Sequence, residues 1–92
     1  MLTARREERL AAIAQELAQR YGVPTSTISA DLADPSAPAR IFEETERRGL
    51  RIDALVNNAG YGVPNYFRNR PWPVHAEFIQ VMVTAVVHLT HL

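Results

Sequence analysis

The chain has 92 residues, and its ten arginines balance ten acidic residues, so the formal net charge is zero. This length fits one small domain, and the absence of a basic surplus argues against a nucleic-acid or anionic-membrane partner. Neither cysteine nor lysine occurs, which excludes disulfides, thiolate metal sites and any mechanism that needs a lysine amine. With no apolar run long enough to cross a bilayer, we expect a cytoplasmic protein without a metal site.

A helix and a strand are predicted in the first third of the sequence. Apolar residues recur at three- and four-residue steps over Thr3–Tyr21, which is typical of an amphipathic helix. Thr3 is expected to cap this helix, and Gly22 to end it. The segment Thr25–Ala30 is short and rich in β-branched residues, which favours a strand.

The same alternation continues in the middle of the chain. The Asp34-Pro35 pair is typical of a helix start, and a helix is expected from there to Arg48, with Gly49 as its left-handed cap. The run Ile52–Val56 is apolar and partly β-branched, so it is predicted to be a strand covered on both faces.

A loop and a long apolar helix complete the pattern. Residues 60–73 contain two glycines and three prolines and are expected to form a loop. Residues 74–92 are predicted to be helical, with an inward stripe of Phe78, Met82, Ala85, Val86 and Leu89. Further valines lie off this stripe, which indicates that the helix is buried on more than one side, by its own domain or by a partner.

The order helix, strand, helix, strand, helix predicts an α/β domain with parallel strands. Ligands of such sheets bind beyond the carboxyl ends of the strands. Two polar or small-residue segments occupy these places, Asp31-Leu32 after the first strand and Asn57–Gly60 after the second. We therefore expect any binding site to include both segments.

Four segments, in order, resemble the short-chain dehydrogenase/reductase family. They are Ala4-Arg5-Arg6-Glu7-Glu8-Arg9-Leu10, Ala30-Asp31-Leu32-Ala33-Asp34-Pro35, Asp53-Ala54-Leu55-Val56-Asn57-Asn58-Ala59-Gly60 and Thr84-Ala85-Val86-Val87-His88-Leu89-Thr90. They are similar to the end of that family's second strand, the end of its third, the NNAG segment closing its fourth, and the following helix. The resemblance implies a partial Rossmann-like, doubly wound parallel sheet, with residues 1–92 as part of one NAD(P)-binding domain.

The resemblance also implies a function and a set of site residues. It implies an NAD(P)-dependent oxidoreductase that acts on a carbonyl or an alcohol, with NADP as the expected cofactor and NAD as the alternative. Arg5 would face the 2′-phosphate of the adenosine. Asp31 and Leu32 would flank the adenine, and Asn58, Ala59 and Gly60 would line the ribose, where small residues let a ligand approach the backbone. Asn57 is expected to tie neighbouring strands together.

Several family features have no counterpart in this sequence. The glycine-rich turn and the catalytic tyrosine–lysine pair are absent, and Met82 stands where the family has an active-site asparagine. Because the glycine-rich turn and the tyrosine–lysine pair are missing, we expect the 92 residues alone to be inactive. In addition, the thioether of Met82 cannot hold the water that an amide would hold. The family's first two strands would lie between the strands ending at Ala30 and Asn57, so these two either pair directly or leave bare edges. A rival hypothesis is a non-catalytic interaction module, or a homo-oligomer, that associates through the helix over 74–92.

Overall fold

The computed structural model describes residues 1–92, which form two compact units, residues 1–31 and residues 32–92. Both units combine helices with irregular segments, and the first also contains the sheet. No helix in the structure combines the length and the apolar character that crossing a membrane would need.

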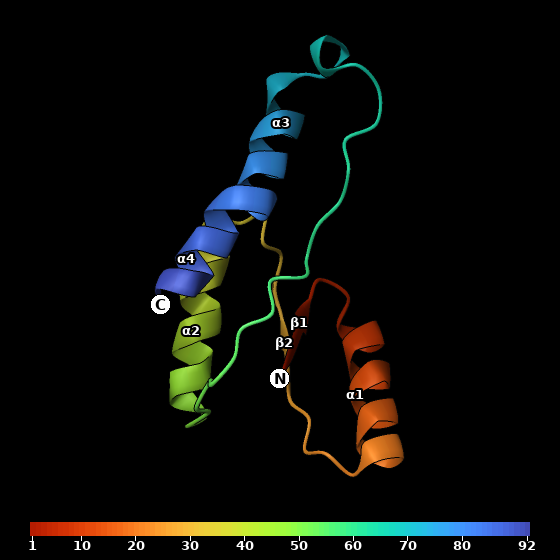
Figure 1. The fold of residues 1–92 in the computed structure, drawn as a ribbon, viewed down its shortest axis with the longest axis vertical. Coiled ribbons are helices and arrows are strands. Elements are labelled where there is room, and N and C mark those ends of the chain that lie inside the picture. The colour runs from red at the N-terminus through yellow and green to blue at the C-terminus, as the bar shows by residue number, and fades with distance from the viewer. The chain divides into compact units, whose positions relative to one another are not determined.

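The first unit is a strand–helix–strand arrangement (Figure 1). Strand β1 (Leu2–Ala4) pairs in parallel with β2 (Thr27–Ser29), and helix α1 (Glu7–Tyr21) connects them. The carboxyl-terminal edge of the ladder is set by the pairing of Ala4 with Ser29. Because parallel strands need a crossover connection, α1 lies along the sheet, where it buries Leu10.

The start of the first helix differs from the prediction, whereas its end agrees with it. Thr3 lies within β1 and does not cap α1, which begins at Glu7 after Arg6. The reason is the ladder: the Leu2 amide donates to the Ser26 carbonyl at 2.8 Å, which holds the first residues in an extended conformation. The predicted end of the helix is confirmed, because Gly22 has φ 64° and its amide donates to the Ala18 carbonyl.

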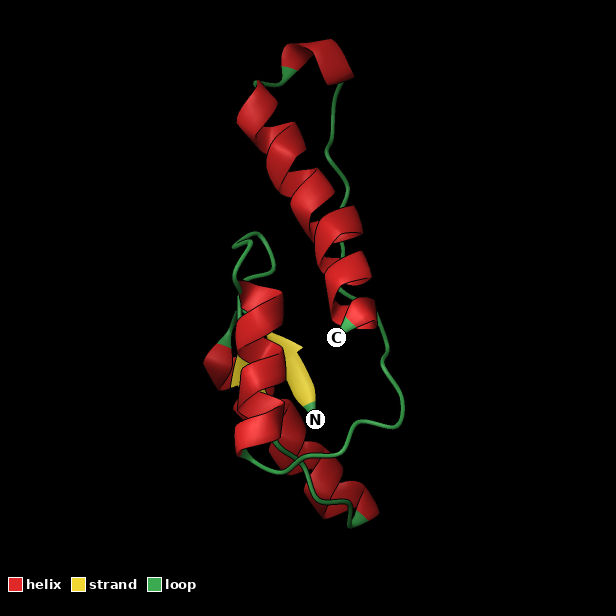
Figure 2. Ribbon diagram, turned by 90° about the vertical axis from the view of Figure 1, so that its left-hand side faces the viewer, coloured by secondary structure: helices red, strands yellow, loops and turns green.

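The second unit is helical. Helix α2 (Ala37–Arg47) packs against α4 (Ala85–His91), and a short 3₁₀ turn, η1 (Phe67–Asn69), precedes α3 (Trp72–Ile79). A π turn, η2 (Gln80–Thr84), joins α3 to α4, so the three form one continuous rod (Figure 2). The buried residues of this unit are Ala37, Pro38, Ile41, Thr45, His75, Val81 and Ala85.

The inward stripe predicted for the last helix is only partly right. Ala85 is fully buried, but Met82 is exposed and Val81 is the buried residue of the π turn. A π turn closes its hydrogen bond over five residues instead of four, which shifts the buried face of the rod relative to a regular helix.

The strand predicted over Ile52–Val56 does not form, and this prediction is wrong. No ladder includes these residues, and the Val56 side chain is 82% exposed. A strand needs a neighbouring strand to receive its backbone hydrogen bonds, and the only ladder in the structure joins β1 to β2. One of the two expected arrangements was a direct pairing of the segment ending at Asn57 with the strand ending at Ala30. This pairing does not form either, so that prediction is also wrong.

Helix α2 begins later than the Asp34-Pro35 pair predicts. Its first residue is Ala37, with Pro38 in the first turn as expected. Asp34 instead forms a turn before the helix: its carboxylate accepts from the Ser36 amide at 2.9 Å. This is the usual behaviour of an aspartate that hydrogen-bonds to the backbone two residues ahead.

Candidate functional site

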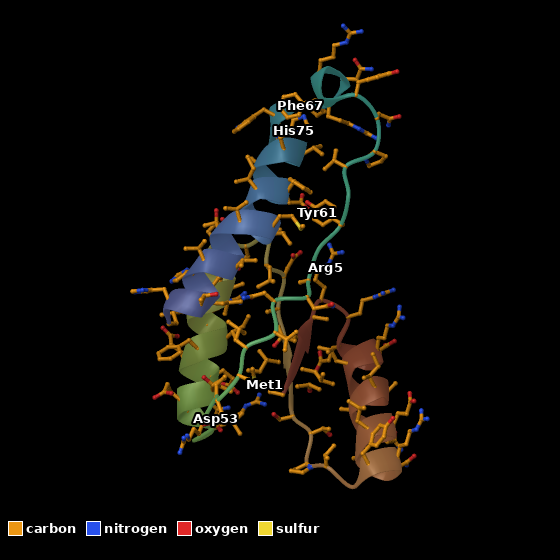
Figure 3. All side chains as sticks on the ribbon, in the orientation of Figure 1. Met1, Arg5, Asp53, Tyr61, Phe67 and His75 are labelled. Atoms are coloured by element: carbon orange, nitrogen blue, oxygen red, sulfur yellow. The ribbon has the colours of Figure 1, made fainter.

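A cavity of about 260 Å³ opens where β1 gives way to α1 in the first unit. It is lined by Ala4, Arg5, Arg6, Arg9, Leu10 and Ile13. Arg5 directly follows β1, and Figure 3 shows its side chain at that end of the strand. Three arginines and the apolar residues Leu10 and Ile13 therefore line one small cavity.

The side chains of the three arginines of this cavity form no ion pair within the chain. No carboxylate lies within ion-pair distance of Arg5, Arg6 or Arg9, although Glu7 and Glu8 are adjacent in sequence. The four arginines that do pair with carboxylates, Arg40, Arg47, Arg48 and Arg51, all belong to the second unit. Because like charges repel and nothing neutralises them, the cavity is suited to an anion.

The parallel register also brings a predicted acidic residue to this edge of the sheet. Ala4 pairs with Ser29, and the Ala30 amide donates to the Ala4 carbonyl at 3.1 Å. Arg5 and Asp31 therefore both leave the sheet at the carboxyl ends of their strands. The Ser29 hydroxyl donates to the Arg5 carbonyl at 3.2 Å, which fixes the backbone at the mouth of the cavity.

The segment around Leu32 is held by a small polar network in the second unit. Besides the Ser36 amide, the Asp34 carboxylate accepts from the Ser36 hydroxyl at 2.8 Å and from Arg40 Nη2 at 3.0 Å. The hydrogen bond from the Ser36 amide, then that from its hydroxyl and the charge of Arg40, lower the pKa of Asp34. Leu32, two residues before, is half-buried next to this fixed turn.

The segment Asn57–Gly60 is exposed and lies against the helical rod. The Asn57 amide donates to the Thr90 hydroxyl at 3.3 Å. At the other end, a Cβ atom added to Gly60 would lie 3.0 Å from Met82 Sδ, so only glycine fits there without a shift of that side chain. Asn57 was expected to tie strands together, but in this unit it ties the segment to α4.

The residues following Gly60 are also held on the rod. The Tyr61 ring meets the Phe78 ring edge to face at 5.7 Å between centroids. Farther along, His75 is buried, its Nε2 lies 3.0 Å from the Phe67 carbonyl, and the two rings stack (Figure 3). The loop that follows the NNAG segment is thus attached to α3 at two points.

The six expected site residues fall into two groups. Arg5 and Asp31 belong to the first unit, and Leu32, Asn58, Ala59 and Gly60 to the second. The cavity adds residues that the sequence reasoning missed, chiefly Arg9 with Leu10 and Ile13. Positions 6, 9, 10 and 13 are three or four residues apart, so their side chains lie on one helical face. This spacing is the sequence signal that could have identified these cavity residues.

Comparison with known proteins agrees with this architecture. A model of the short chain dehydrogenase family matches residues 1–92. A very-long-chain 3-oxoacyl-CoA reductase of Laccaria bicolor is 33% identical over 98% of this chain, and sulfoacetaldehyde reductase 2 of Chromohalobacter salexigens is 34% identical over 99%. The chain spans 27% and 36% of the length of these relatives.

A solved structure supports the same assignment. The L-sorbose reductase of Gluconobacter frateurii, in complex with NADPH and L-sorbose, superimposes with a TM-score of 0.89 at 28% identity. The match covers 98% of this chain and 34% of the reductase. The chain therefore belongs to the short-chain dehydrogenase/reductase family.

Proposed function

We propose that this chain forms the adenosine side of an NADP-binding pocket, in an oxidoreductase that interconverts a carbonyl and an alcohol. The observation that carries the proposal is the cavity at the end of β1, where Arg5, Arg6 and Arg9 stand without carboxylate partners. Family membership supports the proposed reaction class, and the three arginines support the proposed preference for the phosphorylated cofactor.

The residues of the cavity fit a phosphate group. Guanidinium groups bind phosphate oxygens through paired, charge-assisted hydrogen bonds. A cation near the beginning of a helix is unfavourable because the helix dipole is positive there, so Arg6 and Arg9 each have an electrostatic reason to attract an anion. Sites that prefer the unphosphorylated ribose commonly place an acid at this position, and here it is Arg5.

The remaining residues would bind the adenosine. Asp31, at the same sheet edge as Arg5, would accept a hydrogen bond from the adenine amino group, and Leu32 would cover the ring. Asn58, Ala59 and Gly60 would line the ribose, where their exposure and small size leave the backbone accessible. NADP(H), when bound, supplies or accepts the hydride, while the work of these residues is to bind and orient the adenosine half.

Calorimetric titration of the chain with NADP⁺ and NAD⁺ tests the proposal. We expect NADP⁺ to bind more tightly, and Arg5→Ala to weaken NADP⁺ by about 1.5–3 kcal/mol, the scale of a charge-assisted hydrogen bond, while leaving NAD⁺ unchanged. Arg20→Ala is the matched control, because Arg20 lies at the far end of α1 over the Tyr21 ring. Equal affinity for both cofactors, before and after the Arg5 change, would rule the assignment out.

A second proposal concerns self-association. Ile79, Val83 and Val87 follow one another at four-residue steps along the rod, and their side chains are 44%, 53% and 63% exposed. Exposed apolar side chains grouped on one helix are typical of an interaction surface. We propose that this row, which we call the apolar row, contacts a second copy of the chain.

A further inference from the structure

We propose that the turn before the helical rod docks on the surface of a lipid bilayer that contains anionic lipids. This turn, which we call the aromatic turn, presents the side chains of Tyr66, Phe67, Arg68 and Trp72 to solvent. The three aromatic residues are 77%, 73% and 66% exposed, more than any other aromatic residue of the chain. None of the four belongs to the candidate cofactor site, so the proposal is independent of the proposed function.

The backbone of the aromatic turn is held in place by its own hydrogen bonds. Asn65 has φ 77°, a left-handed conformation that asparagine adopts more readily than most residues, and it turns the chain into η1. The Asn69 amide donates to the Tyr66 carbonyl at 3.0 Å, and Arg70 Nε donates to the Pro64 carbonyl at 3.3 Å. The exposed rings are therefore carried by a fixed turn.

The ring of Phe67 is anchored in the second unit and still faces water. It stacks on the His75 ring with 4.0 Å between centroids, and the Phe67 carbonyl lies 3.0 Å from His75 Nε2 (Figure 3). His75 is buried, so this contact fixes Phe67 on the rod while leaving most of its surface in solvent. Each Å² of apolar surface left in water forfeits about 25 cal/mol. An apolar group held outward by a buried neighbour is typical of an interaction surface.

The charges of the aromatic turn favour an anionic partner. Arg68 and Arg70 are the only residues that carry a charge at neutral pH between Asp53 and Glu77. Arg68 forms no ion pair, and it lines a cavity of about 480 Å³ together with the first two rings of the turn. The whole chain has a net charge of zero, so this basic character is local to the turn. An arginine close to an anionic bilayer contributes about 1 kcal/mol to binding.

The types of side chain and their place favour a bilayer over a protein partner. Tryptophan and tyrosine combine an apolar ring with a polar edge, and they are enriched where a bilayer meets water. Arginine can pack its methylene groups beside such rings while its charged end reaches a lipid phosphate. Within the second unit, η1 lies beyond the α3 end of the rod and away from α4 (Figures 1 and 2), so the aromatic turn can meet a flat surface.

Trp72 is the only tryptophan of the chain, so its fluorescence reports directly on the aromatic turn. The test titrates the 92-residue chain with vesicles of phosphatidylcholine alone and with vesicles of phosphatidylcholine mixed with phosphatidylglycerol. With the mixed vesicles we expect a blue shift of the Trp72 emission and protection from a water-soluble quencher. Binding should be tighter than to the neutral vesicles and should weaken as salt is added. An unchanged emission with mixed vesicles at low salt, or equal binding to both kinds of vesicle, would overturn the proposal.

Matched variants test whether the aromatic turn is the part that binds. We expect Arg68→Gln to weaken vesicle binding about fivefold, which corresponds to about 1 kcal/mol for one arginine. Tyr66→Ser should weaken it about tenfold, or about 1.4 kcal/mol, near the low end for burying a large apolar side chain. Arg20→Gln and Tyr21→Ser remove the same residue types from an exposed place at the end of α1 and should change nothing.

Two further results of these measurements would count against the proposal. If the changes at Arg20 and Tyr21 weaken binding as much as those at Arg68 and Tyr66, attachment does not depend on the aromatic turn. If soluble polyglutamate shifts the Trp72 emission and vesicles do not, the turn recognises an acidic protein surface and not a bilayer. Circular dichroism of every variant confirms that the helices have remained folded.

Discussion

The side chain of Asn57 is joined to that of Thr90: the Asn57 amide donates to the Thr90 hydroxyl at 3.3 Å, and that hydroxyl donates to the Val86 carbonyl at 2.7 Å. The two residues are 33 positions apart in sequence. This contact fastens the start of the segment that would line the ribose to the end of α4. At the other end Gly60 lies close to the Met82 side chain, so the segment follows the rod without forming part of a sheet.

Removing the Asn57–Thr90 contact should destabilise the second unit slightly. We expect Asn57→Ala and Thr90→Val each to cost about 0.5–1 kcal/mol, because the contact is exposed and a typical hydrogen bond contributes about that much. The double variant should cost little more than either single one. Urea denaturation measures the three values, and Thr90→Ser, which keeps the hydroxyl, is the control. Fully additive losses would show that the two side chains do not interact.

A side chain at position 60 should force Met82 to move. The added Cβ of Gly60→Ala would lie 3.0 Å from Met82 Sδ and 3.2 Å from its Cε, and we expect a cost of about 1 kcal/mol, at the low end for overpacking because the methionine side chain is flexible. Met82→Ala should remove that cost, so that Gly60→Ala becomes nearly neutral in its presence. The measurement is again the free energy of unfolding. An equal cost of Gly60→Ala in both backgrounds would contradict the contact.

Acid should weaken the Glu44 network on α2. Hydrogen bonds from Arg47 and then Arg48 lower the pKa of Glu44 from 4.5 to about 2. Since the folded-state pKa lies below the unfolded one, the contribution of Glu44 to stability is present above pH 4.5 and is lost as the pH falls toward 2. The free energy of unfolding of Glu44→Gln should therefore fall less steeply across this window. Glu16→Gln, at a residue without an ion pair, is the control, and parallel curves for Glu44→Gln and the unchanged chain would refute the prediction.

A charge on the apolar row should prevent self-association. We expect the chain to sediment as a dimer or larger species at tens of micromolar, and Val83→Glu or Val87→Glu to convert it to a monomer, because burying an unpaired carboxylate in an apolar interface is costly. Ala12→Glu, at an exposed position of α1, should leave the dimer intact. A monomer with one sharp cooperative transition above about 55 °C, inside the usual range of mesophilic domains, would contradict the self-association proposal.

The sequence predicted those elements whose stability is largely local. The periodicity of α1 and α2 and the left-handed cap at Gly22 are encoded within one or two turns, and both helices form close to where they were expected. The strand predicted over Ile52–Val56 failed because a strand depends on a partner, which its own residues do not reveal. For the same reason the residue pattern alone did not predict the pairing of β1 with β2, which defines the edge of the sheet.

The candidate site likewise has residues that were predicted from the sequence and residues that were not. Arg5, Asp31 and the NNAG segment were identified because their residue types and order resemble a known family. Arg9 was missed because its relevance depends on the direction in which the helix carries its side chain, which only the cavity shows. The π turn at Gln80–Thr84 was likewise not predicted, because its residue types do not distinguish a π turn from an α-helix.

The most direct test of the central claim is to observe the arginine Nε–Hε signals by NMR while the chain is titrated with NADP⁺ or NAD⁺. The account predicts that the Arg5 signal shifts on addition of NADP⁺ and stays in place with NAD⁺, while the signal of Arg20, at the other end of α1, responds to neither. If Arg5 responds equally to both cofactors, or to neither, the cavity at the end of β1 does not bind the 2′-phosphate.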